Sequence, residues 1–448
     1  SSHTGIRRLA CPLPFMRPSA LPASSPAGTD RPRLDGGGPL APSGSAVLPL
    51  GQEVGAPGDS AQAALASFSW ARLLEDPGRR RELCEALSTD SFAVVEVPED
   101  LARDVALMQE LSMQFFGRPS EERRGLGRLR LYRDKVVGYR ELAGGGACFL
   151  EVHALAGGGA IPRPKAPLGL ALAAAKLHLQ LQAMARELIT WLAEHAGVPP
   201  AALLQSLDEA ELRNLEDGDC GSSVLRLCCY GCGPDADQDD NHQGVADVEG
   251  DGGALVQRTG SDQEEAENEG SDVFFDEHTD ASFLTLAPVG SQPGLQMRDA
   301  SGAAWLDVES GFSGCGGHLV VFIGDFVEVL TNGRYTAACH RVAARRARTS
   351  GGWRGGEAAG QRPSLEGRRL SMPFLVRGQP GSRLDTTEFL VAFPAAPLMR
   401  LEGMAYADLR RFLDLKGRRR FSGGHLLGLP TTTTAIGEGG EGGRATGA

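Results

Sequence analysis

The sequence contains no apolar run near the ~20 residues that a membrane-spanning helix needs, so we expect no membrane segment. It also lacks an excess of basic residues: 45 Lys and Arg face 57 Asp and Glu, which speaks against a nucleic-acid-binding surface. The nine cysteines are odd in number and follow no framework spacing. They therefore favour reduced thiols and a cytoplasmic location over a secreted, disulfide-bonded protein.

The first part of the sequence has an unusual amino-acid composition. Between Ile6 and Arg33 the sequence is rich in arginine and serine, and its first acidic residue is Asp30. This composition is typical of organelle transit segments, so a plastid or another organelle is the alternative to the cytoplasm.

Four segments have the composition of disordered chain. Residues 1–62 are dominated by Pro, Gly, Ser and Ala, and residues 421–448 form a C-terminal tail of similar character. The stretch 233–272 holds thirteen acidic residues against one cation, Arg258, and so accounts for the formal net charge of −12. The segment 347–367 is rich in glycine. Both internal segments are predicted to be insertions that loop out of the fold.

The remaining chain divides into three predicted parts. They are an N-terminal helical and mixed region over 63–220, a jelly-roll domain over 221–400 and a C-terminal helix over 401–420. Apolar periodicity predicts helices within 66–87, 100–116 and 169–196, and a strand over 92–97.

From residue 224 onward, short strands replace the helical pattern. We expect them over 224–230, 283–287, 294–297, 319–323, 326–330 and 370–376. Asn332-Gly333 is a strong hairpin signal, because both residues tolerate positive φ. Helices followed by many short strands predict an α+β protein with a jelly-roll core, that is, a cupin-like double-stranded β-helix, on which the N-terminal helices pack.

Two imidazoles and one carboxylate stand out as candidate metal ligands: His278, Asp280 and His340. In an extended segment, side chains two residues apart point to the same side, so His278 and Asp280 can face one ion. Two His and one carboxylate form the facial ligand set of mononuclear iron(II) sites, which leaves coordination positions open. The alternative is a loop with an incidental His and Asp, and a hydrogen-bonded core histidine at 340.

Arg369 lies among apolar residues and is followed two positions later by Ser371. An arginine directed into a barrel needs an anionic partner, and a carboxylate suits its planar fork. The alternative is a surface cation.

Residues 85–415 resemble the iron(II)- and 2-oxoglutarate-dependent dioxygenases of the isopenicillin N synthase-like group. The most specific strings are His278 to Thr285, Ile323 to Tyr335 and His340 to Val342. The resemblance implies a double-stranded β-helix fold, iron(II) as the metal, and 2-oxoglutarate and dioxygen as co-substrates, with ascorbate considered as a reductant.

Residue by residue, the resemblance implies that His278, Asp280 and His340 bind the iron. It implies that Arg369 and Ser371 bind the distal carboxylate of 2-oxoglutarate. Tyr230 lies where the family often has a co-substrate-binding tyrosine, although the chain reads Cys-Cys-Tyr-Gly where the family usually has Asn-Tyr-Tyr-Pro.

The function implied is hydroxylation or desaturation of a small organic metabolite by a monomeric enzyme, with release of succinate and carbon dioxide. Two alternatives remain open. One is an iron oxidase of the same fold that does not use 2-oxoglutarate, and the other is a non-catalytic jelly-roll binding protein. Arg226, Phe283, Phe374 and Arg377 predict a partly apolar substrate pocket with an anion anchor.

Overall fold

In a computed structural model of the chain, the described residues are 65, 67–125, 128–131, 135–141, 147–155, 160–161, 167–207, 220–231, 271–312, 317–345, 368–379, 381–393 and 401–415. The predicted disordered segments 1–62, 347–367 and 421–448, with the transit-like stretch, lie outside them. So does the acidic stretch 233–272, apart from Ser271 and Asp272, which begin a strand. Within the described ranges, no helix has the length and apolar character needed to cross a membrane.

The main sheet has the strand order β1-β2-β12-β9-β15-β7-β5-β4-β3, with β14 paired to β7 and β6 to β5. Apart from the parallel β1–β2 pair, neighbouring strands are antiparallel. In chain order, the strands are β1 (Ser67–Ser69), β2 (Phe92–Glu96), β3 (Arg128–Leu131), β4 (Lys135–Glu141), β5 (Ala147–Leu155), β6 (Ala160–Ile161), β7 (Cys220–Tyr230), β9 (Leu284–Pro288), β12 (His318–Ile323), β14 (Arg369–Ser371) and β15 (Phe374–Leu375).

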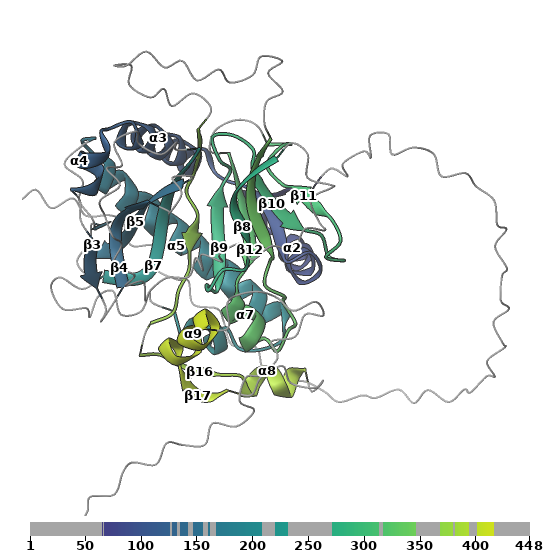
Figure 1. Ribbon diagram of the computed structural model, residues 1–448. Coiled ribbons are helices and arrows are strands. Elements are labelled where there is room, and N and C mark those ends of the chain that lie inside the picture. The colour runs from purple at the N-terminus through teal and green to yellow at the C-terminus, as the bar shows by residue number, and fades with distance from the viewer. Residues whose placement is uncertain are drawn as a thin grey trace, which may run out of the picture. The chain divides into compact units, whose positions relative to one another are not determined.

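A smaller antiparallel sheet has the order β11-β10-β13-β8. It consists of β8 (Ser271–His278), β10 (Leu295–Arg298), β11 (Trp305–Asp307) and β13 (His340–Arg345). Phe322 of the main sheet and Met297 of the smaller one share a buried cluster, and Phe149 and Val342 share another. The two sheets therefore face each other across an apolar layer, as in a jelly roll (Figure 1). A two-stranded ribbon, β16 (Arg383–Asp385) with β17 (Glu402–Ala405), lies apart from both.

The helices surround this pair of sheets (Figure 1). They are α1 (Trp70–Glu75), α2 (Pro77–Thr89), α3 (Glu99–Phe116), α4 (Ser120–Arg124), α5 (Leu170–His195), α6 (Ala201–Leu204), α7 (Asp325–Leu330), α8 (Thr387–Ala392) and α9 (Tyr406–Leu415). The predicted helices over 100–116 and 169–196 are confirmed as α3 and α5. The long α5 buries most of its leucines in the largest core cluster, together with residues of β5, β7 and β9.

The prediction of one helix over 66–87 was wrong in its first part. The chain there forms β1 and α1, and a new helix, α2, begins at Pro77. The carboxylate of Asp76 accepts hydrogen bonds from the backbone N–H groups of Gly78 and Arg79. At the start of α2 these two donors have no acceptor within the helix itself. Pro77 suits the first helical position, because it has no N–H to satisfy there. This cap separates α2 from α1.

A second correction concerns residues 326–330, which form the helix α7 and not a strand. Every residue from Asp325 to Leu330 is buried, so the run carries no alternation that would distinguish a helix from a strand. Asn332 and Gly333 do adopt positive φ, at 53° and 77°. However, they end α7: the N–H of Gly333 donates to the carbonyl of Glu328 at 2.8 Å, so there is no hairpin at this position.

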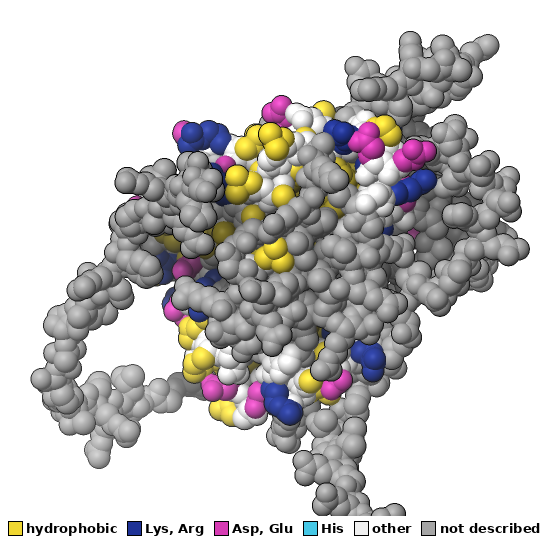
Figure 2. Space-filling view, turned by 90° about the vertical axis from the view of Figure 1, so that its left-hand side faces the viewer, with side chains coloured by type: hydrophobic (Ala, Val, Ile, Leu, Met, Phe, Trp, Pro, Cys, Tyr) yellow, Lys and Arg dark blue, Asp and Glu magenta, His cyan; other side chains and the backbone are white. Residues whose placement is uncertain are grey.

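Charged side chains of both signs are interspersed on the face that Figure 2 shows, with apolar side chains between them. No continuous field of one sign covers the described part of that face. This distribution gives the visible described surface no basic patch of the kind that attracts a phosphate backbone.

Candidate metal centre

His278, Asp280 and His340 meet at one end of the smaller sheet. His278 is the last residue of β8 and His340 is the first residue of β13, and the two are paired across the antiparallel ladder. Residues directly opposite each other in such a pair carry side chains on the same face. Asp280 lies in the turn that leads from β8 to β9 and is 6% exposed. Three positions distant in sequence thus converge because two strands pair in this register.

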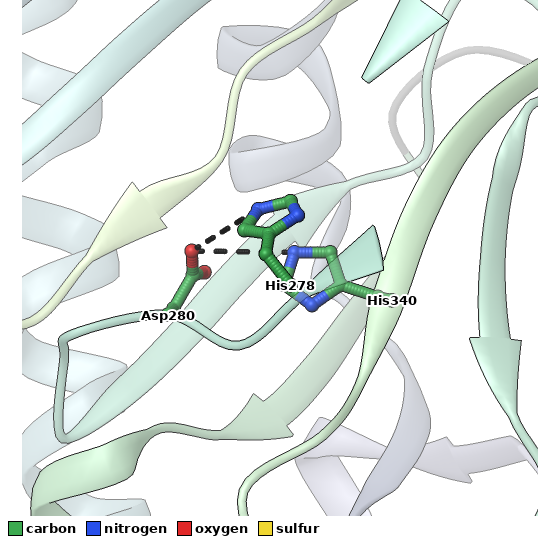
Figure 3. A group of neighbouring side chains, drawn as sticks. All are labelled: His278, Asp280 and His340. Atoms are coloured by element: carbon green, nitrogen blue, oxygen red, sulfur yellow. Dashed lines mark ion pairs between the residues drawn. The ribbon is translucent and has the colours of Figure 1, made fainter. Parts of the chain in front are cut away.

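The donor atoms of these three residues lie within 4.8 Å of one another. Oδ1 of Asp280 is 3.8 Å from Nε2 of His278 and 4.0 Å from Nε2 of His340 (Figure 3). Both distances are shorter than two metal–ligand bonds of ~2.1 Å, the length usual for imidazole nitrogen on a first-row ion. One ion can therefore bridge the carboxylate to either ring.

Hydrogen bonds behind the cluster hold each donor in place. Nδ1 of His278 lies 2.8 Å from the carbonyl oxygen of Asp276, and Nδ1 of His340 lies 3.1 Å from that of Ala338. Because a carbonyl oxygen can only accept, Nδ1 is the donor in each of these hydrogen bonds, and in the neutral ring this leaves the lone pair of Nε2 for a metal. The hydroxyl of Thr285 donates to Oδ2 of Asp280 at 2.6 Å and leaves Oδ1 toward the rings.

The charge state of Asp280 suits the same role. Burial alone would raise the pKa of this carboxyl group. The neighbouring imidazoles of His340 and His278, together with the hydrogen bond from Thr285, nevertheless lower its pKa below the usual value. Asp280 is therefore an anion at neutral pH, as a metal ligand must be.

Arg369, the first residue of β14, is 3% exposed. Its Nη2 donates to both carboxylate oxygens of Glu309 at 2.9 Å, and its Nε donates to the carbonyl of Gln292 at 3.1 Å. The second terminal nitrogen, Nη1, is buried and has no hydrogen-bond partner among the described residues. A buried guanidinium nitrogen without an acceptor is costly, so this atom marks a place for an anionic group.

The six residues predicted from the sequence line one cavity: Tyr230, His278, Asp280, His340, Arg369 and Ser371. The rings of Phe149, Phe275 and Phe322 make much of its remaining wall apolar. Arg226 also lines it and forms an ion pair with the buried Glu151 at 2.8 Å.

Three residues expected in the pocket lie elsewhere. Phe283 stacks with Phe326 and Tyr406 in the core, and Phe374 and Arg377 are buried away from the cavity lining. Conversely, the sequence did not point to Glu309. This residue follows an ordinary strand pattern, and its local sequence does not distinguish it from an acidic residue that is exposed to solvent.

The comparison with known proteins agrees with this geometry. Residues 223–377 match the model of the 2OG-Fe(II) oxygenase superfamily. This part of the chain therefore carries a domain similar to those of the 2OG-Fe(II) oxygenases. The matched segment contains all six of the cavity residues predicted from the sequence, and members of the superfamily use iron(II) and 2-oxoglutarate.

Among curated relatives, the chain is 41% identical over 69 residues to leucoanthocyanidin dioxygenase 2 of Oryza sativa subsp. japonica, covering 15% of this chain and 17% of that protein. It is 26% identical over 262 residues to gibberellin 2-beta-dioxygenase 4 of Arabidopsis thaliana, covering 58% of this chain and 68% of that one. The match to the first relative thus spans less than a fifth of its length.

Among solved structures, a 2OG-Fe(II) oxygenase family protein from Caulobacter crescentus superposes with a TM-score of 0.52 at 18% identity. The superposition covers 78% of this chain and 98% of that one. At this identity the similarity establishes the shared jelly-roll fold of these oxygenases.

The residues present fit the two groups that the superfamily implies. Two Nε2 atoms and one carboxylate oxygen, each held from behind by a hydrogen bond, match the preference of iron(II) for a 2-His-1-carboxylate site. The unpaired Nη1 of Arg369 matches the carboxylate that a dicarboxylic co-substrate would bring into the same cavity.

Proposed function

We propose that the protein is an iron(II)- and 2-oxoglutarate-dependent dioxygenase that hydroxylates or desaturates a small organic metabolite, with release of succinate and carbon dioxide. One observation carries the proposal. The cavity that contains the converging donors of His278, Asp280 and His340 also contains the unpaired guanidinium nitrogen of Arg369. A metal site and an anion site are thus open to the same space, as a reaction between a bound metal and a 2-oxo dicarboxylate requires.

His278, Asp280 and His340 would hold iron(II) through Nε2, Oδ1 and Nε2. Three protein ligands leave positions for a chelating co-substrate and for dioxygen. When bound together, the iron and 2-oxoglutarate would supply, with dioxygen, the oxidant that cleaves a substrate C–H bond. The protein keeps the three donors aligned through Thr285 and the carbonyls of Asp276 and Ala338, so that little reorganisation is needed when the metal binds.

Arg369 would receive the distal carboxylate of 2-oxoglutarate at Nη1, with Ser371 and Tyr230 beside it. Burial raises the pKa of Tyr230 well above its usual value, although the charge of Arg369 opposes this, so its hydroxyl stays protonated. Ser371 and Tyr230 can therefore both donate to a carboxylate.

The substrate side of the cavity favours a partly apolar molecule. The rings of Phe149, Phe275 and Phe322 offer apolar contact and keep water away from the reacting carbon. Arg226 lines the cavity and brings a positive charge to it, and it pairs with Glu151 together with Arg140. We infer that the substrate carries an acidic group that binds at Arg226. The enzyme is proposed to act as a cytoplasmic monomer, with ascorbate as a reductant.

The test is anaerobic loading with iron(II), followed by oxygen, 2-oxoglutarate labelled at C1 and a panel of small organic acids. The proposal expects substrate-stimulated release of labelled carbon dioxide and an equal amount of succinate. His278→Ala should abolish both. His318→Ala, which removes a ring that contacts Phe312 and does not line the cavity, should not. Oxidised product without loss of 2-oxoglutarate would favour the iron oxidase, and failure to retain iron would favour the non-catalytic binding protein.

A further inference from the structure

Glu309 is a carboxylate inside the fold that the reaction scheme above does not use. It is 1% exposed, and the hydrogen bonds of its carboxylate lie in the region around Arg369. Oε1 accepts from the backbone N–H of Gly290 at 2.9 Å, and Oε2 accepts from those of Gly294 and Leu295 at 2.8 Å each. Both oxygens also accept from Nη2 of Arg369. The carboxylate therefore connects the loop between β9 and β10 to the guanidinium.

The same loop encloses Arg369 from the other side. The carbonyl of Gln292 accepts from Nε, and the backbone at Gly294 comes so close that an added Cβ would lie 2.8 Å from Cδ and Nε of Arg369. The ring of Tyr230 lies 5.4 Å from the guanidinium carbon. With Nε and Nη2 engaged, Nη1 is the nitrogen left for a ligand. Glu309 and the loop thus determine which part of the arginine the cavity presents.

Two effects of Glu309 on an incoming carboxylate oppose each other. Its negative charge offsets that of Arg369, so charge alone predicts that removing it would tighten the binding of a dicarboxylate. Its hydrogen bonds, however, fix the direction of Nη1. Without them, three backbone N–H groups and Nη2 lose their acceptor inside the protein, and the freed arginine can turn toward other acceptors. Because Glu309 is held by several hydrogen bonds in a fixed loop, orientation outweighs charge.

We propose that Glu309 is a positioning residue for co-substrate binding: it locks Arg369 so that Nη1 meets the distal carboxylate of 2-oxoglutarate. The proposal rests on the proposed function, since it needs 2-oxoglutarate as the ligand. It makes Glu309 necessary for recognising the distal carboxylate, and unnecessary for binding the 2-oxo acid end at the metal.

The experiment compares two ligands by anaerobic titration calorimetry on the full chain loaded with iron(II). One is 2-oxoglutarate, and the other is 2-oxopentanoate, which has a methyl group in place of the distal carboxylate. In Glu309→Gln we expect the Kd for 2-oxoglutarate to rise about tenfold or more, as is typical when a partner of a ligand-binding group is removed. The Kd for 2-oxopentanoate should change less than about twofold. The kcat at saturating 2-oxoglutarate should be retained, while KM rises.

Glu309→Asp separates orientation from charge. It keeps the negative charge, but it is one methylene shorter and cannot reach both the loop amides and Nη2, so it should weaken 2-oxoglutarate binding as Glu309→Gln does. Glu328→Gln is the matched control, because Glu328 is a buried acid that accepts a backbone N–H from Ala337 and does not line the cavity. It should leave the binding of both ligands unchanged.

The outcomes are distinct. Tighter or unchanged 2-oxoglutarate binding in Glu309→Gln, or equal losses for both ligands, would overturn the role of Glu309 while leaving the proposed function intact. If the iron-loaded wild type binds 2-oxopentanoate and 2-oxoglutarate equally well, Arg369 does not recognise the distal carboxylate and this inference fails. If the wild type binds neither ligand, the proposed function fails, and the inference fails with it.

Discussion

The hydroxyl of Thr285 donates a 2.6 Å hydrogen bond to Oδ2 of Asp280, on the side of the carboxylate that faces away from His278 and His340. This bond restricts rotation of the carboxylate and keeps Oδ1 toward the two rings. Thr285→Val preserves the shape of the side chain and removes the bond. We expect its affinity for iron(II) to fall about 10- to 100-fold, the usual effect of losing a partner of a metal ligand. Competition against a chelator of known affinity measures this change.

Thr331→Val serves as the control for that experiment. Thr331 is also fully buried, and its hydroxyl donates to the carbonyl of Val327 at 2.6 Å, away from the metal centre. This variant should lose stability and keep its affinity for iron(II). If Thr285→Val binds iron(II) as tightly as the wild type, the orientation of Asp280 does not depend on Thr285.

Tyr230 leads to a second prediction. Its hydroxyl is hydrogen-bonded with Cys228 and Ser371 and lies beside the arginine that would bind the co-substrate. Tyr230→Phe removes one neutral hydrogen-bond donor, worth about 1 kcal/mol, so the Kd for 2-oxoglutarate should rise about fivefold while iron(II) binding stays the same. Tyr335→Phe, a buried tyrosine bonded to His195 on another side of the core, should leave both constants unaltered. An unchanged Kd in Tyr230→Phe would remove this tyrosine from the co-substrate site.

The candidate site was easier to predict from the sequence than the fold around it. His278, Asp280 and His340 were identifiable because they are ligand types of an iron(II) site and lie in strings that resemble a dioxygenase family. The pairing of β8 with β13 brings the two histidines together. Glu309 was missed because its importance comes from burial, which depends on how the loop before β10 folds over Arg369. Nothing in the local sequence distinguishes such an acid from an exposed one.

Two errors in the fold have different causes. The predicted strand 370–376 is two strands, β14 and β15, because Pro373 has no N–H for the ladder. Its carbonyl still accepts from the N–H of Arg226, so both pieces stay paired with β7. The helix α7 was mistaken for a strand because a short, wholly buried run fits either structure. Local chemistry at Pro373 decided the first case, and tertiary burial decided the second.

Among the described glycines, Gly324 leaves the least room for an added Cβ. A Cβ added there would lie 2.2 Å from the carbonyl oxygen of Ser282 and 2.4 Å from its Oγ, and the following residue, Asp325, donates its N–H to the carbonyl of Asp280. We expect Gly324→Ala to lower the free energy of unfolding by about 1–3 kcal/mol, as overpacking does, and to weaken iron(II) binding as the Asp280 turn shifts. Denaturant unfolding and metal titration measure the two effects.

Gly311→Ala is the matched substitution for that test, because a Cβ there meets nothing within 4 Å. Its stability should stay within about 0.5 kcal/mol of the wild type. If Gly324→Ala is as stable as the wild type, the turn at Ser282 can shift to make room for the Cβ without lowering the free energy of unfolding.

His178 predicts how stability depends on pH. It is fully buried in α5, its ring lies edge-on to Phe374, and burial lowers its pKa to about 4. In the unfolded chain the pKa returns to about 6.5. Between these values the unfolded chain binds a proton that the folded protein does not. The stability is therefore fully present above pH 6.5 and is lost as the pH falls toward 4, by about 2 kcal/mol between pH 8 and pH 5.

Denaturant unfolding of the metal-free protein at a series of pH values tests this dependence. His178→Gln can still donate to the carbonyl of Ser223, which His178 contacts at 3.3 Å, but it cannot take up the proton. Its stability should change much less between pH 8 and pH 5, with a remaining slope from His195, whose pKa burial also lowers. His318→Gln removes an imidazole from β12 and should keep the full slope. If His178→Gln loses as much stability at pH 5 as the wild type, then His178 takes up its proton while folded, and the core around α5 opens enough to admit the charge.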